Sequence, residues 1–347
     1  EIYTTQYRYD ISGKLLETED ALGNITSIHY DDFGRKVAMD DKDLGHWEYR
    51  YDAFGNLVWQ KDAKGQLVTF AYDQLGRMLQ RSEPESVTHW IYDTRENGIG
   101  KLAYVTKSDN GYREDVYYDS LGRLQTTTTT IEGESYTTTT TYDSQGRPDT
   151  FTYPSVTGLS DIAVKNHYQI GSKAYKQTDA ITGALHWELQ EADEEHTKVT
   201  YGNGLQTVKT FDKYTSFLKG IDTGFYSDVQ SLRYDYDDIG NVKSREDKNL
   251  NLLEEFGYDG LNRLTSYYVN GFTNRTVDYD AIGNITYKSD VGTYQYNSTR
   301  PHAVTQTGDK VHNYDANGNL YETTIGATVD RSVTWTSFNK PASMTQN

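Results

Sequence analysis

The 347-residue chain carries 34 basic and 51 acidic side chains, and its net charge of −17 argues against nucleic acid or an anionic membrane surface as a partner. It has no cysteine, which excludes disulfides and thiolate metal sites, and no run of 18 apolar residues that would predict a transmembrane helix. Because the chain starts at Glu1, without a Met or a signal-peptide pattern, we expect a piece of a longer protein. An apolar content of 35% with 31 Tyr and 29 Gly predicts an all-β fold.

One short motif recurs through residues 1–153, of which 1–100 are the most regular, and again through residues 236–347. It reads Tyr-Asp-x-x-Gly, usually followed by Asn, Arg or Lys and then an apolar residue. The clear copies are Tyr9, Asp10, Gly13 and Leu15; Tyr51, Asp52, Gly55 and Leu57; Tyr72, Asp73 and Gly76; Tyr118, Asp119, Gly122 and Leu124; Tyr236, Asp237 and Gly240; Tyr279, Asp280 and Gly283; and Tyr314, Asp315 and Gly318. Weaker copies begin at Tyr30, Tyr142 and Tyr258. Self-similarity of this kind is typical of a repeat architecture.

The motif has the chemistry of a β-hairpin turn. Asp at the first position and Gly at the fourth are preferred in a type I turn, and a left-handed residue closes the three-residue hairpin loop. In that register Asp52 faces Asn56 across the hairpin and Tyr51 faces Leu57, and each such pair is worth roughly 0.2–1 kcal/mol. We therefore expect stability to come from repetition. The residue two before the motif Tyr is usually aromatic or branched, which indicates strand alternation.

A second set of turns lies between the motif turns. Turn glycines fall at 13, 23, 34, 45, 55, 65 and 76, so two turns occur in each 21-residue repeat and the predicted strands are six or seven residues long. The copy at Tyr92 is interrupted, which predicts a longer loop before Leu102. Threonine runs 126–130 and 137–141 flank a glycine turn and predict a polar hairpin. The result is an antiparallel meander of about 33 strands, more than the roughly ten that an open twisted sheet usually holds, so we expect it to curl.

Residues 154–235 lack the clear motif, but turn signals persist. They are Gly158, Gly171-Ser172, Thr182-Gly183 and Gly202-Asn203-Gly204. We expect divergent hairpins there, with a short helical turn or an acidic loop at 191–195. Residues 338–341 look like one more degenerate copy of the motif. The predicted organisation is one continuous sheet over residues 1–347, regular in 1–153 and 236–347 and divergent in 154–235.

Few sequence motifs indicate a catalytic, metal-binding or ligand-binding site. The eight His show no metal-ligand spacing, and no nucleophile elbow or P-loop occurs, so no catalytic residue, metal or cofactor is predicted. Asp235–Asn241 superficially resembles a calcium loop that would close on Glu246, although Ile239 occupies a ligand position. Two of the repeated carboxylates could in principle form the catalytic pair of a glycosidase. However, every motif Asp is already expected to cap a turn, and a catalytic pair should occur once in a chain and not in every repeat. Aromatic residues beside Asp and Asn also suit a carbohydrate site.

The repeated motif resembles the YD repeat of the Rhs family, which includes bacterial polymorphic toxins, B and C components of insecticidal toxin complexes, and the YD shell of teneurins. Residues 201–205 with Phe211-Asp212 also resemble a segment of bacterial members. The resemblance implies a meander that spirals into part of a hollow shell around a C-terminal effector polypeptide. The Asp-Pro-x-Gly-Leu signature that ends the bacterial shell core is missing, so only the scaffold role is implied.

The predicted function is a non-enzymatic shell segment of a secreted or cell-surface bacterial toxin. Its partners would be the rest of the parent shell and the enclosed effector, with no nucleic acid and no membrane insertion. The motif Tyr, Asp, Gly and Leu would act as structural residues. Two alternatives stay open. One is a glycan-binding or adhesive scaffold with exposed aromatic rows, including Tyr7, Tyr49 and Trp90. The other is a hydrolase with a carboxylate pair in the divergent region.

Overall fold

The structure is a computed structural model that describes residues 3–109, 111–169 and 173–347. Apart from one 3-10 turn at Phe225–Ser227, all regular structure in these ranges is β-strand. The chain divides into two units, one of residues 1–90, 107–109 and 275–347 (unit 1) and one of residues 91–106 and 110–274 (unit 2). Among the residues that the structure describes, no helix is long and apolar enough to span a membrane.

Unit 1 holds the first nine and the last eight strands. They are β1 (Gln6–Tyr9), β2 (Leu15–Glu19), β3 (Ile25–Tyr30), β4 (Lys36–Asp41), β5 (Gly45–Tyr51), β6 (Leu57–Lys61), β7 (Leu67–Tyr72), β8 (Met78–Ser82), β9 (Val87–Tyr92), β25 (Arg275–Tyr279), β26 (Ile285–Lys288), β27 (Gly292–Gln295), β28 (Gln306–Thr307), β29 (Lys310–Tyr314), β30 (Leu320–Ile325), β31 (Thr328–Trp335) and β32 (Pro341–Gln346).

Unit 2 holds the strands between them. They are β10 (Leu102–Lys107), β11 (Arg113–Tyr118), β12 (Leu124–Ile131), β13 (Glu134–Tyr142), β14 (Pro148–Thr152), β15 (Ala163–Tyr168), β16 (Ala174–Asp179), β17 (Leu185–Ala192), β18 (His196–Tyr201), β19 (Gln206–Phe211), β20 (Leu218–Thr223), β21 (Gln230–Tyr236), β22 (Val242–Asp247), β23 (Leu252–Tyr258) and β24 (Leu264–Val269).

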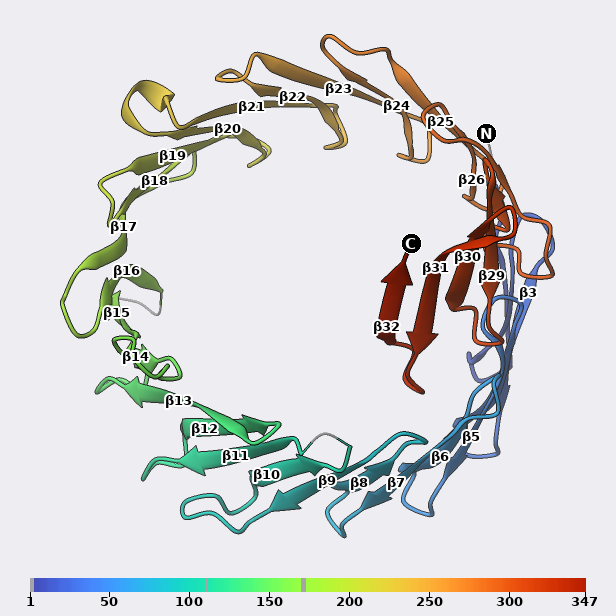
Figure 1. Cartoon of the computed structure of the whole chain (residues 1–347), viewed down its shortest axis with the longest axis horizontal. Helices are drawn as coiled ribbons and strands as arrows, with labels where there is room; N and C mark the ends of the chain where they lie inside the picture. The colour runs from blue at the N-terminus through green and yellow to red at the C-terminus, as the bar shows by residue number, and fades with distance from the viewer. Residues whose placement is uncertain (1–2, 110, 170–172) are drawn as a thin grey trace. The chain divides into compact units, whose positions relative to one another are not determined.

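Within each unit every strand pairs antiparallel with the strand that follows it along the chain, as the order of the labels in Figure 1 shows. The described ranges hold 32 strands in these two meanders. The predicted all-β hairpin meander is therefore confirmed. No large side chain in the described ranges is fully buried, and the few buried apolar residues are mostly small, such as Ala103 and Val277. The fold therefore depends on the strand ladder and on half-buried side chains more than on a conventional core.

The turn at Asp52 shows how one repeat is built. Gly55 N–H donates to the Asp52 carbonyl at 3.2 Å, Asp52 N–H donates to the Asn56 carbonyl at 3.0 Å, and Gly55 has φ 89°. One carboxylate oxygen of Asp52 accepts the N–H groups of Phe54 and Asn56, each at 2.9 Å. Tyr51 lies opposite Leu57, and the register shifts at the next pair, which is a β-bulge just inside the hairpin. The Asp carboxylate thus satisfies turn N–H groups that the ladder cannot reach.

Some degenerate turns have Asn or Ser in the left-handed position that Gly holds in the clear copies. Asn262, Asn339 and Ser216 have φ values of 62°, 56° and 59°. Residues 336–340 form the turn between β31 and β32, so the degenerate copy at the end of the chain is a hairpin.

The divergent region contains antiparallel hairpins, and the structure decides between the helical turn and the acidic loop that the sequence left open at 191–195. Residues 191–195 form no helical turn, because Glu191 and Ala192 belong to β17 and Asp193 caps a tight turn into β18. Strand pairing with β18 continues through Ala192, which leaves too few residues for a helix. The predicted turn at Gly171-Ser172 lies outside the described residues.

Candidate functional site

The most regular feature of the structure is a hydrogen bond from most motif tyrosines to the hairpin before them. Tyr72 Oη donates to the backbone carbonyl of Leu57 at 2.9 Å, and Tyr51 Oη donates to that of Lys36 at 2.8 Å. We call this bond a tyrosine rung. The other rungs join Tyr30 to Leu15, Tyr118 to Leu102, Tyr142 to Leu124, Tyr168 to Pro148, Tyr236 to Leu218, Tyr258 to Val242, Tyr296 to Ile285 and Tyr314 to Val304, and Trp335 Nε1 donates to Leu320 in the same way.

The rung always stands at the same place in the strand register. Between β6 and β7 the first paired residues are Trp59 and Thr69, two residues after the acceptor Leu57 and three before the donor Tyr72. The other ten rungs obey the same offset. The backbone ladder between consecutive hairpins therefore stops short of the motif turns. There the tyrosine hydroxyl satisfies a carbonyl that would otherwise lack a strand partner.

A cation covers the ring of many rung tyrosines. The Arg35 guanidinium bonds to the Asp31 carboxylate at 2.7 Å, donates to the Asp52 carbonyl at 2.9 Å, and lies 5.0 Å from the centre of the Tyr51 ring. Arg123 and Arg147 stack in the same way, each 4.2 Å from a tyrosine ring centre. The residue after the turn glycine thus ties its own turn Asp to the tyrosine of the next repeat, an interaction worth about 0.5–1 kcal/mol.

The ionisation of these groups follows from their contacts. Burial raises the pKa of Tyr51 and Tyr72, and raises the pKa of Tyr296 to about 12, so the rung hydroxyls hold their protons. The Asn56 side-chain amide and the turn N–H groups lower the pKa of the Asp52 carboxyl. Backbone N–H groups of Thr215 and Tyr214 with the Lys219 ammonium lower the pKa of Asp212 to about 2. Hydrogen bonds within their own turns likewise lower the pKa of the turn carboxyls of Asp10, Asp20, Asp73, Asp119 and Asp237.

The sequence-predicted site residues occupy these turns. Tyr51, Tyr72, Tyr118, Tyr236 and Tyr314 are rung donors. The turn glycines Gly13, Gly55, Gly76, Gly122, Gly240, Gly283 and Gly318 all have positive φ, from 72° to 94°. Leu15, Leu57 and Leu124 lie opposite Tyr9, Tyr51 and Tyr118, and all three are also rung acceptors for the next repeat. Tyr9 differs, because its side chain is 55% exposed and makes no rung in the described part of the chain.

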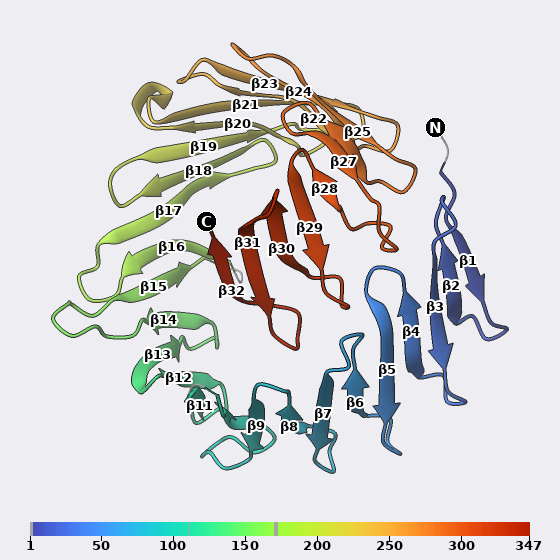
Figure 2. The same ribbon diagram turned by 45° about the vertical axis from the view of Figure 1, so that its right-hand side comes forward.

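A second cluster lies within unit 1, where loops far apart in the sequence meet (Figure 2). Arg300 Nε donates to the Asp43 carbonyl at 2.9 Å, and His302 Nδ1 lies 2.7 Å from the Asp43 carboxylate. Asn317, only 2% exposed, donates its amide to the buried Asp62 carboxylate at 2.6 Å. These contacts join residues about 250 positions apart through side chains, not through strand pairing.

The same cluster continues on both sides of Asn317. Lys64 N–H donates to the Asn317 side-chain oxygen at 3.1 Å, and Lys64 Nζ lies 3.1 Å from the Asp315 carboxylate. Further along, Ser337 N–H donates to the Glu85 carboxylate at 2.9 Å. We call residues 43, 62–64 and 85 with residues 300–302, 315–317 and 337 the loop seam. Asp315, a predicted turn residue, thus also takes part in the seam.

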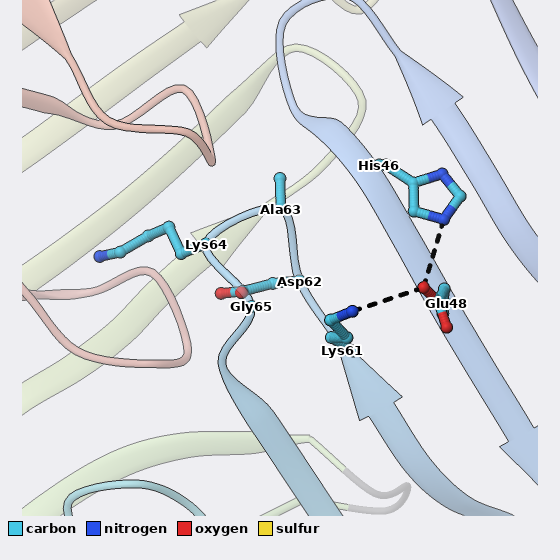
Figure 3. A pocket seen from close by; sticks show the side chains of 7 residues that line it. All are labelled: His46, Glu48, Lys61, Asp62, Ala63, Lys64 and Gly65. Carbon is cyan, nitrogen blue, oxygen red and sulfur yellow. Dashed lines mark ion pairs between the residues drawn. The ribbon is translucent and has the colours of Figure 1, made fainter.

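A polar pocket of about 320 Å³ borders the loop seam and is shown in Figure 3. Glu48 pairs with Lys61 at 3.6 Å and with His46 at 3.5 Å, while Lys64 points away from them. The charged groups in the pocket are therefore already neutralised by one another or by the seam. Within the described ranges, no group of three or more His, Asp or Glu is arranged to hold a metal ion.

The alternatives from the sequence find no assembled site. Asp237 accepts two turn N–H groups on one oxygen and the Asn241 amide on the other, so calcium would have to displace turn contacts. A general acid at neutral pH needs a raised carboxyl pKa, the opposite of the shift at Asp212 in the divergent region. For a glycan, Tyr7 is exposed, but the Lys36 ammonium lies 4.4 Å from the centre of the Tyr49 ring. Glycan binding stays an untested prediction.

Sequence reasoning missed the rungs themselves and the loop seam. The sequence held a signal for one seam residue, because Asn317 occupies the turn position where other copies have Phe54 or Leu75. A polar residue at a place that is otherwise apolar and exposed indicates a separate contact. For Arg300 and His302 no such signal exists, since both lie in an irregular segment between β27 and β28.

Together, the repeated Tyr-Asp-x-x-Gly hairpins and their rungs define a YD-repeat β-sheet protein. Residues 2–106 match the family model described as "Teneurin YD-shell", and no curated protein sequence matches the chain. The family match thus covers the first repeats of the chain, and its likeness to YD-shell proteins over the remaining repeats is one of fold.

Solved toxin-complex structures share the fold. The TcdB2-TccC3-Cdc42 crystal structure superposes with a TM-score of 0.76 at 18% sequence identity, covering 98% of this chain and 22% of that one. The Photorhabdus luminescens Tc holotoxin pore gives a TM-score of 0.73 at 18% identity, covering 99% and 21%. TcdB2-TccC3 without its hypervariable C-terminal region gives 0.74 at 18% identity, covering 98% and 22%. The chain thus spans about a fifth of the length of these chains.

Proposed function

We propose that the chain is a wall segment of a YD-repeat shell that encloses an effector polypeptide of a toxin. It acts by containment and not by catalysis. The observation that carries this proposal is the rung pattern, in which each hairpin satisfies the carbonyl that the ladder leaves open in the hairpin before it. A sheet without unsatisfied backbone groups between hairpins offers few places where a protease could engage an extended segment.

The similarity to toxin-complex structures supports the same role. Those structures contain a far longer chain, so in this proposal further hairpins complete the wall and the effector is a separate part of that longer polypeptide. Localisation follows from the role: a bacterial protein of this kind would be secreted or held at the cell surface. The motif Tyr, Asp, Gly and Leu residues would be structural in every repeat.

Protease protection tests the proposal. The polypeptide of natural length that contains this chain is digested with proteinase K in increasing urea, and fragments are identified by mass spectrometry. If the wall contains the effector, effector peptides appear only at urea concentrations that unfold the strands, as followed by far-UV circular dichroism. Digestion of the effector at the same rate with the strands folded would refute containment, even if the fold itself is correct.

A further inference from the structure

The contacts of the loop seam recur once per repeat. On one side a carboxylate stands in each of three turns of the second set, with Asp43 between β4 and β5, Asp62 between β6 and β7, and Glu85 between β8 and β9. Three connections face these turns from the other side, between β27 and β28, between β29 and β30, and between β31 and β32. Each connection donates a hydrogen bond to one of the carboxylates, so the same kind of contact holds the seam at three successive places.

The contacts at Asp43 and Asp62 use both oxygens of each carboxylate. One oxygen of Asp43 accepts the His302 N–H at 3.1 Å, and the other lies 2.7 Å from His302 Nδ1. One oxygen of Asp62 accepts the Gln66 N–H at 2.8 Å, and the other accepts the Asn317 amide at 2.6 Å. A protonated carboxyl carries a hydrogen on one oxygen and loses acceptor capacity there. Protonation would therefore weaken one contact at each of these places.

The ionisation of Glu85 is linked to the closed seam. Burial raises the pKa of the Glu85 carboxyl, but hydrogen bonds from the Ser337 N–H and from its own N–H lower it, and the net direction is down. A lowered pKa in the closed state means that the ionised form stabilises the contact. This stabilisation is present above the ordinary glutamate pKa, about 4.3, and is lost as pH falls below it.

Acid would also leave like charges facing each other across the seam. Lys64 stands on one side, and Arg300 and His302 stand on the other. Once the carboxylates are neutral, nothing at these places balances the three cations, and they repel one another. The titratable and charged groups that face the carboxylates are Asp20, Asp41, Arg300 and His302 around Asp43; His46, Glu48, Lys61, Lys64 and Asp315 around Asp62; and Arg81, Glu83 and Lys107 around Glu85.

The seam can open without breaking strand pairs, because no strand ladder crosses it in the described ranges. The side chains of the seam that are buried most completely are polar, namely Asp62, Asn317 and Ser337. Water can hydrogen-bond these groups once they are exposed, so opening the seam loses little apolar burial.

We propose that the loop seam is an acid-sensitive latch, in which ionised Asp43, Asp62 and Glu85 hold two parts of unit 1 together and their protonation releases these parts while the strands stay paired. This inference goes beyond containment, because it gives the sheet a defined line along which it can part. The opening is a property of this chain alone, so its test needs no effector and is independent of the proposed function.

Amide hydrogen exchange measures the latch directly, because the backbone N–H groups of Lys64, His302 and Ser337 donate across the seam. Exchange of the full-length chain is followed from about pH 7 to about pH 3.5, with rates corrected for the intrinsic pH dependence of exchange, while far-UV circular dichroism follows the strands. We expect protection of these three amides to fall about tenfold below about pH 4, with strand amides still protected and the dichroism unchanged.

Charge removal at neutral pH is the second measurement. A variant that combines Asp43→Asn, Asp62→Asn and Glu85→Gln keeps side-chain size and one acceptor oxygen at each place but removes the three charges. The matched control removes three exposed charges outside the seam with Glu132→Gln, Glu134→Gln and Glu194→Gln. We expect the seam variant to lose about tenfold in protection at the three amides at pH 7 and to respond little to acid, and the control to behave as the unmodified chain.

Three results would overturn the proposal. One is protection of the three seam amides that persists in the unmodified chain until the strands unfold. Another is loss of protection at seam and strand amides together, which would mean global unfolding and no latch. The third is equal protection of the seam variant and its control at pH 7. If the seam variant does not fold, the titration of the unmodified chain decides alone.

Discussion

Removing a single rung hydroxyl should destabilise the sheet by a measurable amount, and Tyr72→Phe is the cleanest case. The ring of Tyr72 is half-buried, its Oη donates to the Leu57 carbonyl at 2.9 Å, and Phe retains the ring. The substitution therefore removes one hydrogen bond and leaves one carbonyl without a donor. A net intramolecular hydrogen bond is worth about 0.5–1.5 kcal/mol, so we expect the free energy of unfolding to fall by about 1 kcal/mol.

Tyr9→Phe is the matched control for the isolated chain at low concentration. Tyr9 has the same motif and the same cross-strand partner type, but it is 55% exposed and makes no rung in the described residues. We expect its free energy of unfolding to change by less than about 0.5 kcal/mol. The difference between the two variants isolates the rung, because both lose the same hydroxyl from the unfolded chain.

The measurement is urea unfolding followed by tryptophan fluorescence, with amide hydrogen exchange as a local readout. A repeat sheet can open in parts, so exchange at β6 and β7 should increase in Tyr72→Phe even where the global transition moves little. If Tyr72→Phe and Tyr9→Phe lose the same stability, the rung contributes nothing and the account of the motif tyrosine is wrong.

Three further predictions concern the turns, the loop seam and pH. Gly55→Val should lower the free energy of unfolding by about 1–3 kcal/mol, because a φ of 89° strains the backbone of a β-branched residue. No atom lies within 4 Å of the new Cβ, so the effect is one of backbone strain, and an unchanged melting temperature would contradict the turn geometry. Asn317→Ala should cost about 1–3 kcal/mol in urea unfolding, because it leaves one oxygen of the buried Asp62 carboxylate without a donor. Phe54→Ala, at the same position of an exposed turn, should cost under about 0.5 kcal/mol, and similar losses would argue against the seam. Because the pKa of Tyr296 is raised to about 12, its contribution to stability is complete below pH 10 and is lost as pH rises through about 12. Tyr296→Phe should remove the part of the tyrosinate absorbance at 295 nm that appears at the highest pH. An unchanged titration curve would refute this.

The hairpins could be predicted from the motif because the residues that form each turn are close together in the sequence. The Asp and Gly of each copy set the turn, and the turn sets the facing of Tyr51 and Leu57, all within seven residues. Turn signals in the divergent region also marked hairpins, as at Gly204, which takes the left-handed position between β18 and β19. The helical alternative at 191–195 failed because strand pairing on both sides outweighs a short acidic run's local preference.

The contacts between repeats were harder to predict, because they use groups that carry no sequence signal. A rung acceptor is a backbone carbonyl, so the residue that provides it gives no sign of its role. The loop seam joins residues about 250 positions apart, and only Asn317 departs visibly from the pattern of its turn. The Trp335 rung shows the same difficulty, since an indole N–H replaces the phenolic hydroxyl in a copy that also lacks Asp and Gly.

The backbone acceptor has a consequence for how such a chain can change. Leu15, Lys36, Pro148 and Val242 all accept a rung, so the receiving position tolerates aliphatic, cationic and cyclic side chains alike. The hydrogen bond between neighbouring hairpins therefore does not depend on the side chain of the acceptor residue. Whole repeats could be duplicated, deleted or exchanged by recombination while the hydrogen bond between neighbouring hairpins is kept. Gene duplication can therefore lengthen the sheet without new contacts having to evolve.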